Sequence, residues 1–214
     1  QDEPLSAVTL VANDEIMVGT VALPQGLFKI NYAGNGVHVV QEIDPSAFPS
    51  EAGPIPVDVP EGAAADAVPA AVADDGSVID VMVVYTPAAR FAVGGTTAML
   101  SRINLAVSET NQSYGNSGVT QRLNLVHAAE VSYTETNFSA ALYDVTDPND
   151  GKMDNVHTLR DIYAADEVVL IINDPQYCGL AWLMQTVTTA FEDHAFAVVQ
   201  WSCATGYFSF GHEL

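Results

Sequence analysis

The sequence predicts an α/β fold: a mixed, mostly parallel twisted sheet with helices, preceded by a small antiparallel β unit. Near-continuous apolar runs at 78–85 and 166–173 are typical of strands that are buried on both faces. Helical periodicity at 96–114 and 155–165 places helices between and after further strands. The order strand, helix, strand, helix, strand in 77–214 favours parallel strands joined by crossovers.

Residues 1–48 are predicted to form the antiparallel unit. Apolar and polar side chains alternate over 28–32, as expected for a strand with one buried face. The Gly-Asn-Gly sequence at 34–36 separates two extended runs, which is typical of a hairpin because these residues tolerate positive φ. This part holds no cluster of catalytic residue types, and we expect His38 to be an ordinary strand residue.

The composition changes over residues 49–76. Prolines, alanines and acidic residues accumulate there without a single basic residue. Such a stretch is typical of an extended linker. We therefore place a domain boundary near residue 76 and expect residues 77–214 to form a second domain.

The charge balance excludes several partners. The formal net charge is −21, with 27 acidic and 6 basic residues. Nucleic acids and anionic membranes are bound through Lys and Arg patches, so neither is expected as a partner. No stretch approaches the roughly 20 apolar residues of a membrane span. The chain starts at Gln1 without a Met or a signal peptide, which suits a secreted protein after processing, or an edited start.

The chain contains two cysteines, Cys178 and Cys203. A secreted protein would hold them as one disulfide, whereas two free buried thiols are the alternative. The last residues, 211–214, contain His212 followed by Glu213. This pair could open an H-E-x-x-H motif, in which two histidines one helical turn apart bind zinc and the glutamate is a general base. The pair alone is weak evidence.

Several segments together are more specific than that pair. They resemble the reprolysin-like branch of the metzincin zinc endopeptidases, in its bacterial secreted form, over residues 77–214. The resemblance rests on the segments 78–85, 111–118, 153–160, 178–182 and 203–214. It implies a metzincin-like α+β catalytic domain with zinc as cofactor and peptides or proteins as substrates. It also implies that residues 1–76 are a pro-region, which would pack on the catalytic domain.

The resemblance assigns roles to individual residues. His212 would bind zinc, and Glu213 would take a proton from the zinc-bound water and return it to the leaving amine. An antiparallel edge strand would bind the substrate backbone, and it comprises Gly179, Leu180, Ala181 and Trp182. The two cysteines would tie this strand to the stretch that leads into the zinc helix.

The chain also departs from the family pattern HExxHxxGxxH, because the second and third histidines, the glycine and the Met-turn are missing. A catalytic zinc needs three protein ligands. His127, His157 and His194 lack the helical spacing to His212 and are expected to be surface or strand residues. We therefore expect a truncated chain that neither binds zinc tightly nor cleaves peptides. Residues 1–76 lack cysteine, so this region would inhibit by covering the cleft rather than by a thiolate.

Other classes of function remain as alternatives. One is a non-catalytic secreted binding protein with a β module tethered to an α/β module. A serine hydrolase using Ser209 is poorly supported, since no G-x-S-x-G motif occurs. The acidic stretch 142–151 lacks the spacing of a calcium loop, so a solvated turn is expected for Asp144, Asp147, Asn149 and Asp150.

Overall fold

The structure is a computed structural model that describes residues 6–57, 78–186 and 188–214. Its N-terminal part is a four-stranded antiparallel sheet in which each strand pairs with the next. The strands are β1 (Ala7–Asn13), β2 (Ile16–Leu23), β3 (Gly26–Gly34) and β4 (Val37–Glu42). Positive φ angles at Gly34, Asn35 and Gly36 turn β3 into β4, which confirms the predicted hairpin. A short 3-10 helix, Pro45–Ala47, follows.

A second sheet has six strands in the order β5-β9-β10-β8-β6-β7. All neighbouring pairs are parallel except β9 with β10. The prediction of a mixed, mostly parallel sheet is therefore confirmed. The strands are β5 (Ile55–Val57), β6 (Val78–Tyr85), β7 (Arg122–Glu130), β8 (Glu167–Ile172), β9 (Gly179–Met184) and β10 (Phe196–Gln200).

Strand β6 shows why this sheet needs two apolar faces. Val81 and Val83 pack on one side, in the same cluster as residues of α1 (Pro87–Val93) and α2 (Thr96–Asn116). Met82 and Val84 point to the other side, where α3 (Phe138–Thr146) and α4 (Asn155–Tyr163) cover the sheet. Helices on both faces leave no polar face, which explains the continuous apolar run in the sequence.

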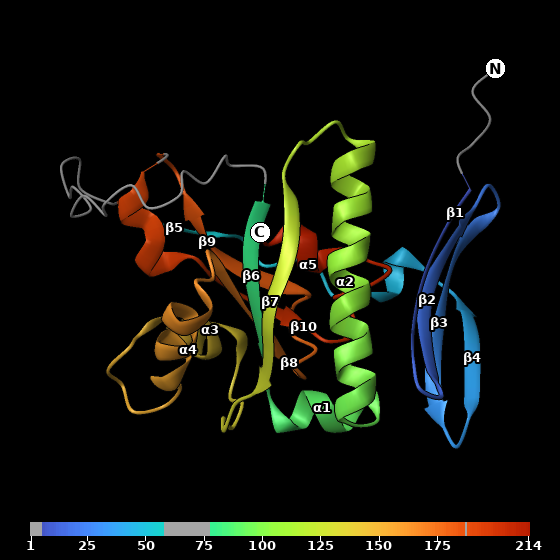
Figure 1. Ribbon diagram of the computed structural model, residues 1–214, viewed down its shortest axis with the longest axis horizontal. Coiled ribbons are helices and arrows are strands. Elements are labelled where there is room, and N and C mark those ends of the chain that lie inside the picture. The colour runs from blue at the N-terminus through green and yellow to red at the C-terminus, as the bar shows by residue number, and fades with distance from the viewer. Residues whose placement is uncertain (1–5, 58–77, 187) are drawn as a thin grey trace.

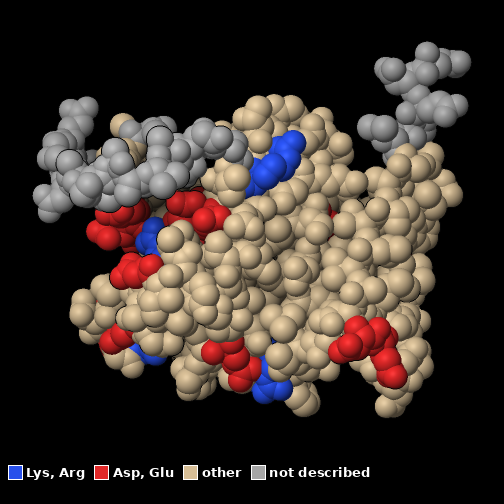
Figure 2. Space-filling view, viewed as in Figure 1, with Lys and Arg blue, Asp and Glu red and all other residues tan. Residues whose placement is uncertain are grey.

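Helix α2 lies between the two sheets (Figure 1). One side of this helix contacts β1 and β2, and another contacts β7. A hydrogen bond from Thr9 Oγ1 to Gln112 Oε1, 3.0 Å long, is part of the first contact. No helix among the described residues is both long and apolar enough to cross a membrane. On the face shown in Figure 2, the charged side chains form small separate groups.

Two helices were not predicted. Helix α1 begins after Thr86, whose hydroxyl accepts a hydrogen bond from the Ala89 amide, and it ends at Gly94 with φ 97°. Helix α3 includes Asp144, which the sequence analysis placed in a solvated turn. That expectation was wrong for Asp144, because this carboxylate is buried and accepts a 2.7 Å hydrogen bond from the Tyr133 hydroxyl.

Candidate active site

The short helix α5 (Ser209–His212) carries the predicted metal ligand. Phe210 anchors it, since its ring is fully buried in the core cluster that α2 also lines. Gly211 touches α2 directly: a Cβ there would lie 2.7 Å from Thr110 Oγ1, so a larger residue would push the helix away. These two contacts fix the backbone from which His212 and Glu213 project.

A disulfide joins Cys178 to Cys203, with the two Cα atoms 5.4 Å apart. Both cysteines are fully buried, and the alternative of two free thiols is wrong. Cys178 immediately precedes β9, and Cys203 lies in the turn between β10 and α5. The bridge therefore holds the predicted substrate strand to the segment that leads into α5, as the resemblance implied.

The Glu213 carboxylate lies against the first residue of β9. A Cβ on Gly179 would come within 2.2 Å of Glu213 Oε1, so only a glycine permits this approach. Leu180 and Ala181 are buried in the sheet, and the half-buried Trp182 donates from Nε1 to Thr146 Oγ1 over 2.8 Å. The structure thus brings the predicted proton acceptor and the predicted substrate strand together.

Strand β9 was expected at the edge of the sheet, but β5 lies outside it. Ile55 pairs with Trp182 in a parallel register, the Ala52 amide donates to Gly179 O over 3.0 Å, and the Cys178 amide donates to Ser50 O over 3.1 Å. Residues 49–57 were assigned to the linker on their prolines. Proline has no N–H to donate, yet it is tolerated on an outermost strand. The remainder of the predicted linker lies outside the described residues.

This outer segment brings a second carboxylate to the site. The Ser209 hydroxyl donates to Glu51 Oε1 over 2.5 Å. Glu51 Oε2 and Glu213 Oε1 are both buried and have no hydrogen-bond partner among the described residues. Burial and the neighbouring Glu51 charge raise the pKa of Glu213 well above its usual range. The repulsion between the two carboxyl groups therefore favours the protonated form of Glu213.

A cavity of about 420 Å³ opens beside this pair, and its lining includes Trp182, His194, His212 and Glu213. His194 was expected to be a surface or strand residue. It lies instead in a 3-10 helix, Thr189–His194, with its Nδ1 buried and without a hydrogen-bond partner. Only the three-dimensional fold reveals this position, because no sequence motif links His194 to His212.

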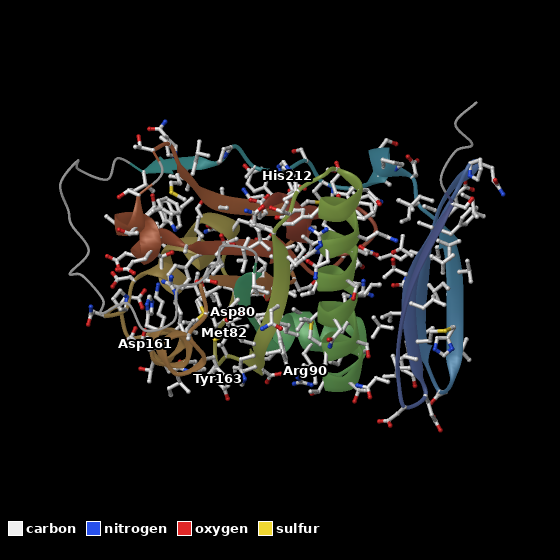
Figure 3. The ribbon with its side chains drawn as sticks, turned by 45° about the horizontal axis from the view of Figure 1, so that its top comes forward. Asp80, Met82, Arg90, Asp161, Tyr163 and His212 are labelled. Atoms are coloured by element: carbon white, nitrogen blue, oxygen red, sulfur yellow. A yellow bond between two sulfur atoms is a disulfide. The ribbon has the colours of Figure 1, made fainter. Side chains whose placement is uncertain are left out.

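His127 and His157 lie away from His212. His127 is on β7 and stacks on Tyr163, with ring centroids 3.9 Å apart. Figure 3 shows Tyr163 across the molecule from His212. The half-buried His157 ring lies 3.1 Å from Val145 O, so it is not a plain surface residue. Within the described parts of the chain, no three His, Cys, Asp or Glu side chains come together as a metal site. The residues present therefore do not by themselves make a three-ligand zinc site.

The sequence is similar to known metallopeptidases. Residues 76–213 match the family described as metallo-peptidase family M12B, reprolysin-like. A peptidyl-Asp metalloendopeptidase of Xanthomonas campestris pathovar campestris is 39% identical over 221 residues, which cover 99% of this chain and 51% of that protein. A protein of the same name from Stenotrophomonas maltophilia is 40% identical over 224 residues, covering 100% of this chain and 51% of that protein. The chain thus spans about half the length of these curated relatives.

Solved structures share the fold at low identity. Metalloproteinase-II from Bacteroides fragilis matches with a TM-score of 0.53 at 13% identity, over 100% of this chain and 68% of that one. A chain in a chaperone–substrate complex matches with a TM-score of 0.51 at 17% identity, over 97% of this chain and 32% of that one. The family match itself spans well over half of the chain. The protein therefore belongs to the reprolysin-like metallopeptidases of family M12B.

Proposed function

We propose that this chain is part of a secreted, zinc-dependent endopeptidase, and that residues 50–57 cover its cleft. The observation that carries the proposal is the contact between Glu213 and Gly179. A carboxylate at the start of a strand that can pair with a peptide is well placed to exchange protons with water beside a peptide carbonyl. The disulfide between Cys178 and Cys203 supports it by preserving this arrangement, and it also suits an extracellular location.

In this proposal, His212 supplies one ligand to the metal that the family implies. Bound zinc would act as a Lewis acid on the peptide carbonyl. Glu213 accepts the proton of the attacking water and passes it to the leaving amine. Gly179, Leu180, Ala181 and Trp182 hold the substrate backbone. The described residues lack a three-ligand group, so we propose that this chain alone does not hydrolyse peptides.

Residues 50–57 would keep the site closed. They use the outer side of β9, which a peptide substrate would need for strand pairing. Strand β5 runs parallel to β9. Glu51 adds a carboxylate directly beside Glu213. A substrate and this segment therefore exclude each other, and inhibition does not require a cysteine.

The name of the two bacterial relatives suggests a substrate class. Both are called peptidyl-Asp metalloendopeptidases. We propose peptide bonds next to aspartate as the cleavage sites of the protein that contains this chain.

The experiment is a casein hydrolysis assay on the longest secreted product that contains this chain. A chelator should abolish the activity, and Glu213→Gln should lower it by about 10²- to 10⁴-fold, the usual range for a lost general base. Glu192→Gln, on an exposed residue outside the cavity lining, is the matched control and should keep full activity. Activity that survives the chelator or Glu213→Gln would refute the mechanism.

One observation favours a second candidate, a non-catalytic two-module binding protein. It is the incomplete ligand set within the described residues. That protein would show no casein hydrolysis in the same assay, with or without added zinc.

A further inference from the structure

A second cavity, also of about 420 Å³, lies between the N-terminal sheet and the helical layer of the catalytic part. It shares no lining residue with the cavity beside His212. Strand β3 contributes Lys29, helix α2 contributes Arg102, and the turn after β10 contributes Trp201. Two of the six basic residues of a very acidic protein thus line one small cavity.

Both cations are buried, because Lys29 is 7% exposed and Arg102 is 5% exposed. Their hydrogen-bond partners are neutral oxygens. Lys29 Nζ donates to Ser202 O over 2.8 Å, and Arg102 donates from Nη2 to Asn31 Oδ1 over 2.8 Å and from Nη1 to Thr205 Oγ1 over 3.2 Å. Arg102 Nε is buried without an acceptor. Neither cation has a carboxylate within ion-pair distance among the described residues.

The carboxylates nearby do not balance this charge. Glu109, 2% exposed, is occupied by the Thr20 hydroxyl and by the Gly206 amide at 2.9 Å. Asp44 and Glu42 also line the cavity, but both are exposed, and Asp44 is held by the amide and the hydroxyl of Ser46. The buried cluster therefore contains two basic groups and a single carboxyl group.

The titration of the cluster agrees with a shortage of negative charge. Burial, together with the charge of Arg102, lowers the pKa of Lys29 to about 7. Burial lowers the pKa of Arg102 to about 10. A buried cation is costly unless an anion pairs with it, so a ligand that brings one negative charge would complete the cluster.

The walls indicate the rest of the ligand. The Trp201 ring lies 5.0 Å from Arg102 Cζ, and the Phe48 ring lies 5.9 Å from Lys29 Nζ. Arginine and a carboxylate match in geometry, and aromatic rings favour an apolar body. We propose that this cavity binds a small organic carboxylate, with the carboxylate beside the Arg102 guanidinium and Lys29 ammonium groups and the apolar part against Trp201 and Phe48.

Such a ligand would touch both parts of the protein at once. Lys29 and Phe48 belong to the N-terminal part, whereas Arg102 and Trp201 belong to the part matched by the peptidase family. A compound that binds only when the two parts are docked stabilises the docked state. A higher concentration of a small carboxylate would therefore stabilise the packing of the N-terminal sheet on α2, independently of any peptidase activity.

The test uses the full chain and calorimetric titration at constant ionic strength. Sodium benzoate is the probe, benzyl alcohol is its uncharged analogue, and sodium sulfate supplies an anion without an apolar body. Benzoate should bind at one site, and the other two compounds should bind at least about tenfold more weakly. Benzyl alcohol lacks the negative charge, and sulfate lacks the apolar body. Equal binding of benzyl alcohol, equal binding of sulfate, or no saturable benzoate binding would each overturn the proposal.

Two variants locate the probe. Ala92 lines the cavity from α1, so Ala92→Phe fills it without removing a charge. Ala88→Phe, at an exposed position of the same helix outside the lining, is the control. Benzoate affinity should fall at least about tenfold in the first variant and stay within about twofold in the second. Lys29→Met serves as a second loss-of-binding variant if Ala92→Phe does not fold. Unchanged benzoate binding in a folded Ala92→Phe or Lys29→Met protein would overturn the proposal.

Discussion

Glu213 and Gly179 meet so closely that the strand and the carboxylate determine each other's position. A Cβ on Gly179 would lie 2.2 Å from Glu213 Oε1 and 2.5 Å from Glu213 Cδ. The closest atoms belong to the end of a side chain rather than to backbone. A larger residue at 179 would therefore move the carboxylate before it moved the sheet.

Gly179→Ala is thus expected to displace Glu213 and to destabilise the chain by about 1 kcal/mol, the low end of the cost of overpacking, because the end of a flexible side chain moves. Gly53→Ala is the matched control, because a Cβ there meets no atom within 4 Å. Urea unfolding of the two variants checks the prediction. Equal stability of Gly179→Ala and Gly53→Ala would show that the contact is not close in solution.

The segment over β9 depends on a buried hydroxyl. Ser209 is fully buried, and its Oγ is the donor to Glu51 Oε1 at 2.5 Å. Ser209→Ala leaves the partly buried Glu51 Oε1 without its donor, which should cost about 1 to 3 kcal/mol. Hydrogen exchange at the Ala52 amide, which donates to Gly179 O, should become faster as residues 50–57 loosen.

Ser108→Ala is the control for this experiment. Its hydroxyl is exposed and donates only to Asn104 O of its own helix. Exchange at Ala52 should be unchanged in that variant. If Ser209→Ala leaves the Ala52 amide equally protected, Glu51 does not hold the segment.

The sequence predicted those elements whose pattern lies within one short segment. The apolar run at 78–85 predicted a strand that is buried on both faces, and the glycines at 34–36 predicted the hairpin. Helix α3 carried a usable signal that was missed: Phe138, Ala141, Leu142 and Val145 have helical spacing and are all buried. The neighbouring Asp and Asn residues made the region look like a loop.

The rest depends on contacts between distant parts of the chain. Strand β5 is three residues long and contains Pro56, so nothing local distinguishes it from a linker. Its pairing with β9 is visible only in the fold. The contact of Glu51 with Glu213 and the approach of Lys29 to Arg102 likewise join different elements. No spacing rule within a single sequence predicts such pairs.

The disulfide should account for a substantial part of the stability of the site. It closes a loop with a sequence separation of 25 residues. Cross-linking a loop of this size restricts the unfolded chain and is worth about 3 kcal/mol. The paired variant Cys178→Ser, Cys203→Ser should lose that amount of unfolding free energy and therefore unfold at a lower urea concentration. Reductant should lower the unfolding midpoint of the wild type but not that of the variant. Identical unfolding of both proteins with and without reductant would contradict the bridge.

The half-buried Glu167 should make stability depend on pH. Burial, together with the neighbouring Asp166 carboxylate, raises the pKa of Glu167 to about 7. An acid whose pKa is raised on folding binds its proton more tightly in the folded state. Its contribution is complete below the ordinary glutamate value and is lost as the pH rises through about 7. Glu167→Gln stays uncharged and should reduce the loss of unfolding free energy between about pH 5 and 8 by on the order of 2 kcal/mol, which is measured as a flatter decline in Tm. Glu192→Gln, at an exposed position, should decline like the wild type, and a parallel decline in Glu167→Gln would rule out Glu167 as the cause.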